Sequence, residues 1–286
     1  MNPFYTPDQC ERNVVEETNV CQPKNDVKYA KEIQLCTPQD LELHKHVSSI
    51  PLSPLFFSPI LSYETIPSLP THVLTYREEL THPFIFFNSK SGMDKILYLV
   101  SSFRHIVQAL DMLHSNGVHC IDYEKIGYHK SDTPRIYGFR NEPHPDQLHF
   151  CPMEYHLLTC MKNQGIGAFS RDNIHHCVRL FFQKNTRYIS VSSCEKDTIR
   201  SHMDCLVDEF SFLVNKPLSF LEDVVEKNSD KAYVYGIGVF FAEMVHQYDF
   251  DMVPDELVFL INRCRSVSLK FRPSLHDVMK ELEQFG

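Results

Sequence analysis

The charged residues with the clearest potential for chemistry lie between Leu113 and Arg140, in the segment LHSNGVHCIDYEKIGYHKSDTPRIYGFR. Lys125 and Arg140 could hold an anion such as a phosphate directly, because a fixed cation stabilises phosphate charge. The alternative interpretation is that both side chains face solvent, as most lysines and arginines do. The elements that surround this segment decide between an anion site and a solvated loop.

A second set of residues raises the question of a metal site. It comprises His175, His176, Cys177, Cys194, His202 and Cys205. Their spacing matches no closed four-ligand pattern, and adjacent histidines on a helix point in different directions. We therefore expect no metal here. The sequence also has no GxSxG, HExxH or Walker motif, so hydrolase, metalloprotease and P-loop functions have no support.

The charged segment is expected to follow a long helix and to contain a hairpin. Apolar residues recur every three or four positions from Ser91 onward, which predicts an amphipathic helix that ends at Gly117. The recurring residues are Leu99, Phe103, Val107, Leu110 and Leu113. Strand-like pieces at 125–128 and 135–137 flank a polar turn at 131–134, which predicts a hairpin.

The part of the chain before this helix is expected to be rich in strands. Residues 1–26 are polar and read as an arm, and VKYAKEIQL at 27–35 predicts a strand. Thr37, Pro38 and Asp40 then predict a capped helix start. The apolar runs LFFSPILSY, HVLTYREEL and HPFIFFN predict short antiparallel strands rather than helices.

The part after the hairpin is expected to be helical. The predicted helices are 173–183, 196–214, 219–227, 231–246, 254–265 and 274–285. Ser274 and Asp277 form a capping-box pattern at the start of the last one. The helix at 231–246 is apolar on most sides, which indicates burial.

Three motifs resemble those of eukaryotic-type protein kinases and occur in the family's order, and a fourth segment between them resembles a further motif. LHSNGVH resembles the lead-in to the catalytic loop, and KAYVYGIGVFFAEM resembles the family's KADVYSFGVxLxEM helix. RCRSVSLKFRPSLHDVMKELE is similar to the closing helix pair with its RPS motif, and HFCPMEYHLL resembles the APE motif with one residue inserted.

The resemblance implies an α+β chain with a protein-kinase-like two-lobed fold. An arm at 1–26 would precede a reduced, strand-rich N-lobe at 27–90 and a larger helical C-lobe at 91–286. Residues 155–230 would form an inserted segment after the APE-like motif, which either packs on the helical lobe or docks a partner. The resemblance also pairs Glu154 with Arg272 in a buried, structural ion pair.

The resemblance assigns remnant catalytic roles to a few residues. Lys31 would match the ATP-positioning lysine, with Glu42 on the following helix as its partner, and Asp122 would match the catalytic base. An alternative interpretation is that Lys31 is solvated and that Glu42 lies on the helix surface. No register of the loop supplies both the base and the metal-binding Asn. Aligned from LHSNG, Gly127 falls at the Asn; aligned from the following strand, Cys120 falls at the Asp and Lys125 at the Asn.

The remaining parts that hold magnesium ATP in the family are replaced. Gly138 stands at the DFG aspartate, within Gly138-Phe139-Arg140, and glycine offers no ligand to a metal. No glycine occurs from Met1 to Leu35, where a glycine-rich phosphate loop would lie. Tyr233 replaces the Asp that anchors the catalytic loop from below.

Composition narrows the class of partner. The net charge is −9, which argues against a phosphate-backbone binder, so we expect a protein partner and neither nucleic acid nor membrane. The ten cysteines show no CxxC spacing, and the amino terminus has no signal-peptide pattern. These features lead us to expect an intracellular protein, cytoplasmic or nuclear, with reduced thiols.

The functional expectation is a catalytically inactive, kinase-like protein, or pseudokinase, without a cofactor. It would act by protein binding as a scaffold, decoy or structural subunit. One alternative is a divergent Ser/Thr protein kinase that uses ATP and magnesium with Lys31 and Asp122. Another is a structural assembly component that uses a kinase-like fold for its surface.

Overall fold

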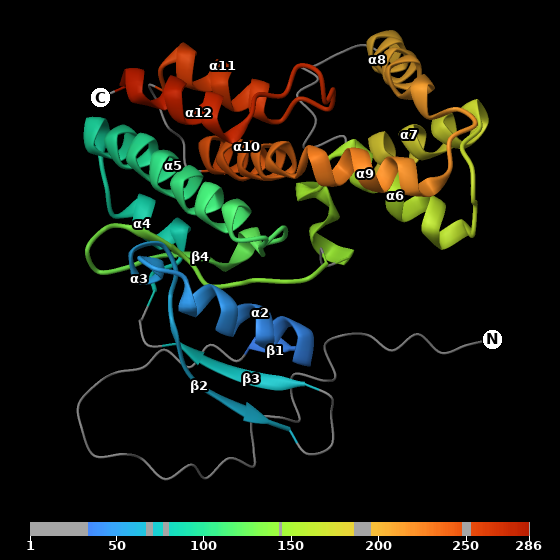
Figure 1. The fold of residues 1–286 in the computed structure, drawn as a ribbon. Helices are drawn as coiled ribbons and strands as arrows, with labels where there is room; N and C mark the ends of the chain where they lie inside the picture. The colour runs from blue at the N-terminus through green and yellow to red at the C-terminus, as the bar shows by residue number, and fades with distance from the viewer. Residues whose placement is uncertain are drawn as a thin grey trace, which may run out of the picture.

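The chain is α+β and mostly helical, with two small antiparallel sheets (Figure 1). The structure is a computed structural model, and it describes residues 34–66, 71–76, 80–142, 145–185, 196–247 and 253–285. The predicted arm and Lys31 lie outside the described residues, as does most of the strand predicted at 27–35.

The first sheet and helix α2 lie together at one end of the molecule (Figure 1). The sheet has the strand order β1-β3-β2 and comprises β1 (Gln34–Cys36), β2 (Ile60–Thr65) and β3 (His72–Tyr76). Helix α2 (Pro38–Ser49) begins as predicted, since the backbone N–H of Asp40 donates to the side chain of Thr37 over 3.1 Å. Helix α3 (Ser53–Phe56) follows.

The strand predicted for HPFIFFN is wrong, because these residues form helix α4 (Pro83–Asn88). His82 caps the helix by accepting a hydrogen bond from the N–H of Phe84, and Pro83 occupies the first turn, where its missing N–H costs nothing. The Phe86 ring stacks on Tyr128 with a centroid distance of 3.9 Å. The phenylalanine-rich composition favoured a strand, but the cap and the proline set the helix.

The long helix and the hairpin match their predictions. Helix α5 (Gly92–Ser115) ends as Gly117 adopts a φ of 72°, and the N–H of Val118 donates back to the carbonyl of Leu113. Strands β4 (Ile126–Tyr128) and β5 (Pro134–Ile136) pair antiparallel as the second sheet. This hairpin lies between α5 and the first sheet, and β5 contacts both α5 and α3 (Figure 1).

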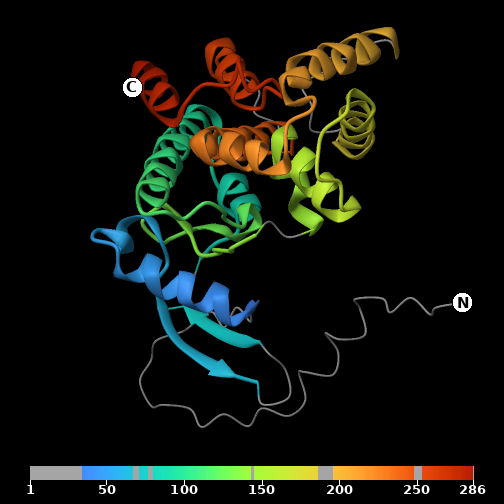
Figure 2. The same ribbon diagram turned by 45° about the vertical axis from the view of Figure 1, so that its right-hand side comes forward.

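The helical end of the molecule is built around α10, which packs against α5, α11 and α12 (Figure 2). The elements are α6 (Met153–Gln164), α7 (Arg171–Asn185), α8 (Lys196–Glu209), α9 (Leu218–Lys227), α10 (Ser229–Gln247), α11 (Asp255–Cys264) and α12 (Leu275–Leu282). Short 3-10 turns also occur at Tyr123–Lys125, Pro145–Phe150, Phe210–Leu213 and Glu283–Phe285. Phe103 of α5 stacks on Phe241 of α10 with a centroid distance of 4.3 Å. The capping box at Ser274 and Asp277 is present as predicted.

The segment at 155–230 joins the main hydrophobic core. Phe169, Phe181 and Phe210 are each at most 2% exposed, and they belong to the same buried cluster as the residues of α5 and α10. Most of the described apolar side chains of this segment are therefore buried within this chain, although Phe212 and Phe220 remain exposed. Within the described residues, none of the helices is both long and apolar enough to cross a membrane.

Candidate functional site

Two segments form the candidate site, the loop at 118–125 and the strand end at 137–141. The N–H of Asp122 donates to the carbonyl of Gly138 over 3.0 Å, and the N–H of Arg140 donates to the carbonyl of Cys120 over 3.3 Å. A third backbone bond, 3.0 Å long, runs from the N–H of Tyr137 to the carbonyl of Lys125. The two segments are thus joined as a short ladder, which fixes their spacing.

Gly138 lies so close to the loop that no side chain fits there without movement. A Cβ atom on Gly138 would lie 2.5 Å from the Cβ of Lys125 and 2.7 Å from the Cβ of Asp122. Contacts this short require the neighbours to shift, and these neighbours are held by the backbone bonds of the ladder. The position compared with a metal-binding aspartate in the sequence therefore has no room for a side chain beside Lys125 and Asp122.

Asp122 is buried and already bonded. Its side chain is 3% exposed, and its Oδ1 atom accepts hydrogen bonds from the amide of Gln147 over 2.5 Å and from the N–H of Glu124 over 3.1 Å. The Nε atom of Arg140 lies 3.5 Å from its Oδ2 atom. A general base must lie within hydrogen-bond reach of the proton it abstracts, and both oxygens of Asp122 face groups of this chain.

The two cations that could hold an anion face partners within the chain. Arg140 lies against Asp122, whose negative charge offsets its own. The ammonium of Lys125 lies over the ring of Tyr137, 5.7 Å from its centroid. Gly127 lies in β4, paired with Arg135, and faces the side chain of Leu80. The residues at the sequence-predicted site are thus brought together, but they bind one another.

Aromatic side chains fill the space between the first sheet and this loop. Tyr76 of β3 donates from its hydroxyl to the carbonyl of Tyr137 over 2.6 Å, and the two rings meet edge to face at 5.4 Å. Both side chains belong to a second buried cluster with Cys36, Leu41 and Leu74. This cluster links the strand-rich end to the segment at 137–141.

Helix α2 contacts the site through Asp40 and His44 and not through Glu42. Glu42 is exposed and pairs with Lys45 on its own helix over 2.7 Å, as in the alternative interpretation of a helix-surface glutamate, while Lys31 lies outside the described residues. The inward carboxylate is Asp40, which accepts from the backbone N–H of Asn141 over 2.9 Å. The periodicity gives the reason, because Leu41 and His44 lie on the buried face and Glu42 on the opposite one.

His44 of α2 and Phe139 form the closest aromatic contact between α2 and the site. Their rings meet edge to face at 5.0 Å, and the N–H of Phe139 donates to Nε2 of His44 over 3.4 Å. Burial is the main cause that lowers the pKa of His44 from 6.5 to about 4, so the ring is neutral at physiological pH. A neutral imidazole can accept that hydrogen bond, whereas a protonated one cannot.

A tyrosine of helix α10 holds the loop through a hydrogen bond to its backbone. The hydroxyl of Tyr233 on α10 donates to the carbonyl of Val118 over 2.5 Å, and the hydroxyl of Tyr123 donates to the carbonyl of Tyr233 over 3.1 Å. A Cβ on Gly236 would collide with the ring of Tyr123, so only glycine permits this approach. The sequence indicated a lost anchor at Tyr233; the structure has an anchor with the opposite hydrogen-bonding sense.

The thiol of Cys120 and the hydroxyls of Tyr123 and Tyr233 are protonated at neutral pH, because burial raises the pKa of each. Burial raises the pKa of Cys120 to about 12, and Asp122 contributes in the same direction. A thiol in this state is a poor nucleophile and metal ligand. Burial also raises the pKa of Tyr123 and Tyr233 well above the usual range, so both hydroxyls keep the protons that they donate.

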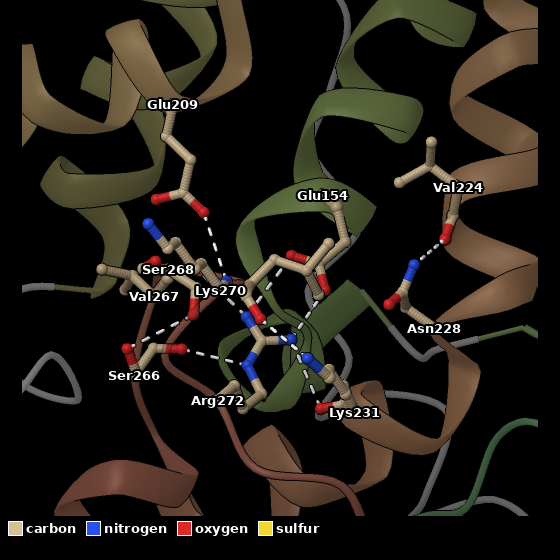
Figure 3. A network of polar contacts seen from close by, with 11 residues as sticks. Glu154, Glu209, Val224, Asn228, Lys231, Ser266, Val267, Ser268, Lys270 and Arg272 are labelled. Carbon is tan, nitrogen blue, oxygen red and sulfur yellow. Dashed lines mark hydrogen bonds and ion pairs between the residues drawn. The ribbon is translucent and has the colours of Figure 1, made fainter. Parts of the chain in front are cut away.

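The expected ion pair between Glu154 and Arg272 is present in the core (Figure 3). Nη1 of Arg272 lies 2.6 Å from Oε1 of Glu154, and both side chains are at most 2% exposed. Arg272 also donates from Nε to the carbonyl of Ser266 over 3.0 Å and from Nη1 to the carbonyl of Lys231 over 3.3 Å. The pair therefore ties α6, the start of α10 and the approach to α12 together, with its donors satisfied.

The histidine and cysteine set does not assemble in the described part of the chain. No group of three or more potential ligands that could hold a metal occurs among the described residues. Cys177 is buried and Cys205 is exposed, while Cys194 lies outside the described residues.

The comparisons with known proteins give no family and no relative. No family model matches the sequence, and no curated protein matches it significantly.

Proposed function

We propose that the chain has a protein-kinase-like, two-lobed fold and acts as a pseudokinase, a catalytically inactive scaffold, decoy or structural subunit that works by binding protein. The strand-rich end with α2 would be the reduced N-lobe, and α5 to α12 would be the C-lobe. The order of the LHSNG, KAYVYG and RPS segments supports this proposal, as does the buried pair of Glu154 and Arg272.

The observation that carries the loss of catalysis is the contact of Gly138 with Lys125 and Asp122. Phosphoryl transfer depends on carboxylate and amide ligands that hold magnesium against the phosphates. The position of one such ligand would be closed by the side chains of Lys125 and Asp122, and Asp122 accepts a hydrogen bond from Gln147 and forms an ion pair with Arg140. A ligand or substrate would have to displace these contacts before it could reach the carboxylate.

In a kinase-like fold, the described residues after Gly138 would lie where a protein substrate is presented, and two of them contact the loop. Phe150 stacks on Tyr123 of the loop with a centroid distance of 4.8 Å, while Gln147 is bonded to Asp122. The residues from Gly138 to Glu154 include no serine, threonine or tyrosine, so this segment has no hydroxyl on which phosphorylation could switch it. These contacts support a fixed, closed arrangement.

A phosphoryl-transfer assay tests the proposal. The full chain is incubated with ATP labelled on the γ-phosphate, with magnesium or manganese, and with a generic basic substrate protein. We expect no incorporation above that of an Asp122→Asn variant. Incorporation that depends on Asp122 would favour the divergent Ser/Thr kinase instead and would overturn the pseudokinase proposal.

A further inference from the structure

Helices α11 and α12 pack side by side and on α10 (Figure 1). A groove lies between the start of α11 and the end of the chain that follows α12. It has a volume of about 410 Å³. Its lining consists of Asp255, Glu256, Phe259, Glu281, Gln284 and Phe285. The groove is remote from the loop at 118–125, which contributes none of these residues.

The groove exposes an apolar side chain that is not buried in the hydrophobic core. Phe259 is 64% exposed, although Leu257 and Leu260 on the opposite face of α11 are buried. Phe285 forms the other aromatic wall and is half-buried against the core. A phenyl ring this exposed gains free energy when a ligand covers it, so the groove is suited to binding rather than to solvation.

The charged residues that line the groove, Asp255, Glu256 and Glu281, are all acidic. Among the described residues, neither Asp255 nor Glu256 makes an ion pair, and both are exposed in the first turn of α11. Glu281 is different, because Arg263 binds it with Nη1 at 2.6 and 2.8 Å from its two oxygens. That ion pair, in which one nitrogen contacts both carboxylate oxygens, ties α11 to α12 beside the groove and leaves two carboxylates for a ligand.

Arg263 shows how a cation sits in this environment. Its guanidinium carbon lies 5.9 Å from the centroid of the Phe259 ring while its nitrogen binds the Glu281 carboxylate. A ligand cation beside Asp255 and Glu256 would meet the same combination of a phenyl ring and a carboxylate. The net charge of −9 adds a field that attracts cationic partners.

We propose that this groove binds a basic peptide segment of a partner protein, with an arginine or lysine side chain placed between Phe259 and the carboxylates of Asp255 and Glu256. This inference deepens the proposed function by naming the chemistry of the partner, and it rests on the proposal that the chain works by binding protein. The carboxylates repel nucleic acid, and the phenyl walls favour the long alkyl stems of lysine and arginine.

Binding of a fluorescein-labelled hexa-arginine peptide tests the groove, with fluorescence anisotropy on the full chain. The Asp255→Asn, Glu256→Gln double variant removes two charges from the groove. The matched Asp223→Asn, Glu226→Gln variant removes two exposed charges from α9, which is not part of the groove. We expect the groove variant to bind about tenfold more weakly, whereas the α9 variant changes binding by less than about twofold.

Phe259→Ala separates a groove from a merely acidic surface, since it leaves every charge in place. We expect it to weaken binding about threefold or more through loss of the ring. Equal weakening by the two charge variants, no effect of Phe259→Ala, or no binding to the unaltered chain would each overturn the groove proposal. None of these outcomes affects the phosphoryl-transfer assay, so the failures of the two proposals are distinguishable.

Discussion

Tyr233 on α10 holds the loop at 118–125 by donating from its hydroxyl to the carbonyl of Val118. A carboxylate at this position would accept hydrogen bonds from N–H groups, whereas the phenol donates to a carbonyl. The loop backbone must therefore turn a carbonyl, not an amide, toward α10. The hydrogen bond from Tyr233 thus fixes the orientation of the loop backbone at Val118.

Removal of that hydroxyl should destabilise the protein. Tyr233→Phe leaves the buried carbonyl of Val118 without its side-chain donor, and we expect the free energy of unfolding to fall by about 1 to 3 kcal/mol. Urea denaturation measures the change. Tyr235→Phe is the matched control, because the buried hydroxyl of Tyr235 has no hydrogen-bond partner in the described structure. Equal losses in the two variants would contradict the anchoring role of Tyr233.

Breaking the buried ion pair of Glu154 and Arg272 should lower the free energy of unfolding far more than breaking a surface pair. Arg272→Met leaves a buried carboxylate unpaired, and we expect a loss of about 3 to 5 kcal/mol in unfolding free energy. Arg171→Met removes one partner of the exposed pair with Asp208 and should cost about 0 to 1 kcal/mol. The combination of Arg272→Met with Glu154→Leu should recover part of the loss. An additive double variant would show that the two side chains act separately.

Enlarging Gly138 should cost stability. We expect Gly138→Ala to lower the unfolding free energy by about 1 to 3 kcal/mol, because its Cβ would press on Lys125 and Asp122. Gly167→Ala is the control, since a Cβ there meets nothing within 4 Å, and it should be neutral or slightly stabilising. Thermal unfolding of both variants measures the difference. A neutral Gly138→Ala would mean that the loop can open to admit a side chain.

Acidification should weaken the contact between α2 and Phe139. The folded-state pKa of His44 is about 4, below its ordinary value of 6.5, so the unfolded chain takes up the proton first as the pH falls. The stabilisation is therefore complete above about pH 6.5 and is lost progressively as the pH falls through about 4. We expect a loss of about 2 to 3 kcal/mol from this group.

His44→Gln isolates this effect, because glutamine keeps an acceptor for the N–H of Phe139 but does not titrate. Denaturation of both proteins between pH 7 and pH 4 gives the comparison. The unaltered chain should lose more stability over this range than the variant. Parallel pH profiles would show that His44 is not a source of the acid sensitivity.

The sequence predicted those parts of the fold that depend on local signals. Helix α5 follows from the spacing of its apolar residues and from the glycine after it, and the capping box at Ser274 follows from residues three positions apart. The pair of Glu154 and Arg272 followed from the resemblance, since spacing alone would not join residues so far apart. For Glu42 the sequence left two interpretations open, and the structure places it on the exposed face of α2, away from Leu41 and His44.

The features that the sequence did not predict depend on contacts between segments that are distant along the chain. Nothing near Tyr233 shows that its hydroxyl reaches Val118, and nothing near Gly138 shows that Lys125 packs against it. The helix α4 was missed for a different reason, because its phenylalanines favour strands and only His82 and Pro83 signal a helix start. The contacts of the site depend on tertiary packing, which the pattern of neighbouring residues does not reveal.

Nucleotide binding is the most direct test of the claim that the metal and nucleotide site is closed. The thermal unfolding midpoint of the full chain is measured with millimolar ATP, with and without magnesium, and again for Gly138→Asp. We predict no magnesium-dependent rise in either protein, because Lys125 and Asp122 occupy the space that the new carboxylate would need. A magnesium-dependent rise of several degrees in the unaltered chain, or its appearance in Gly138→Asp, would contradict the account.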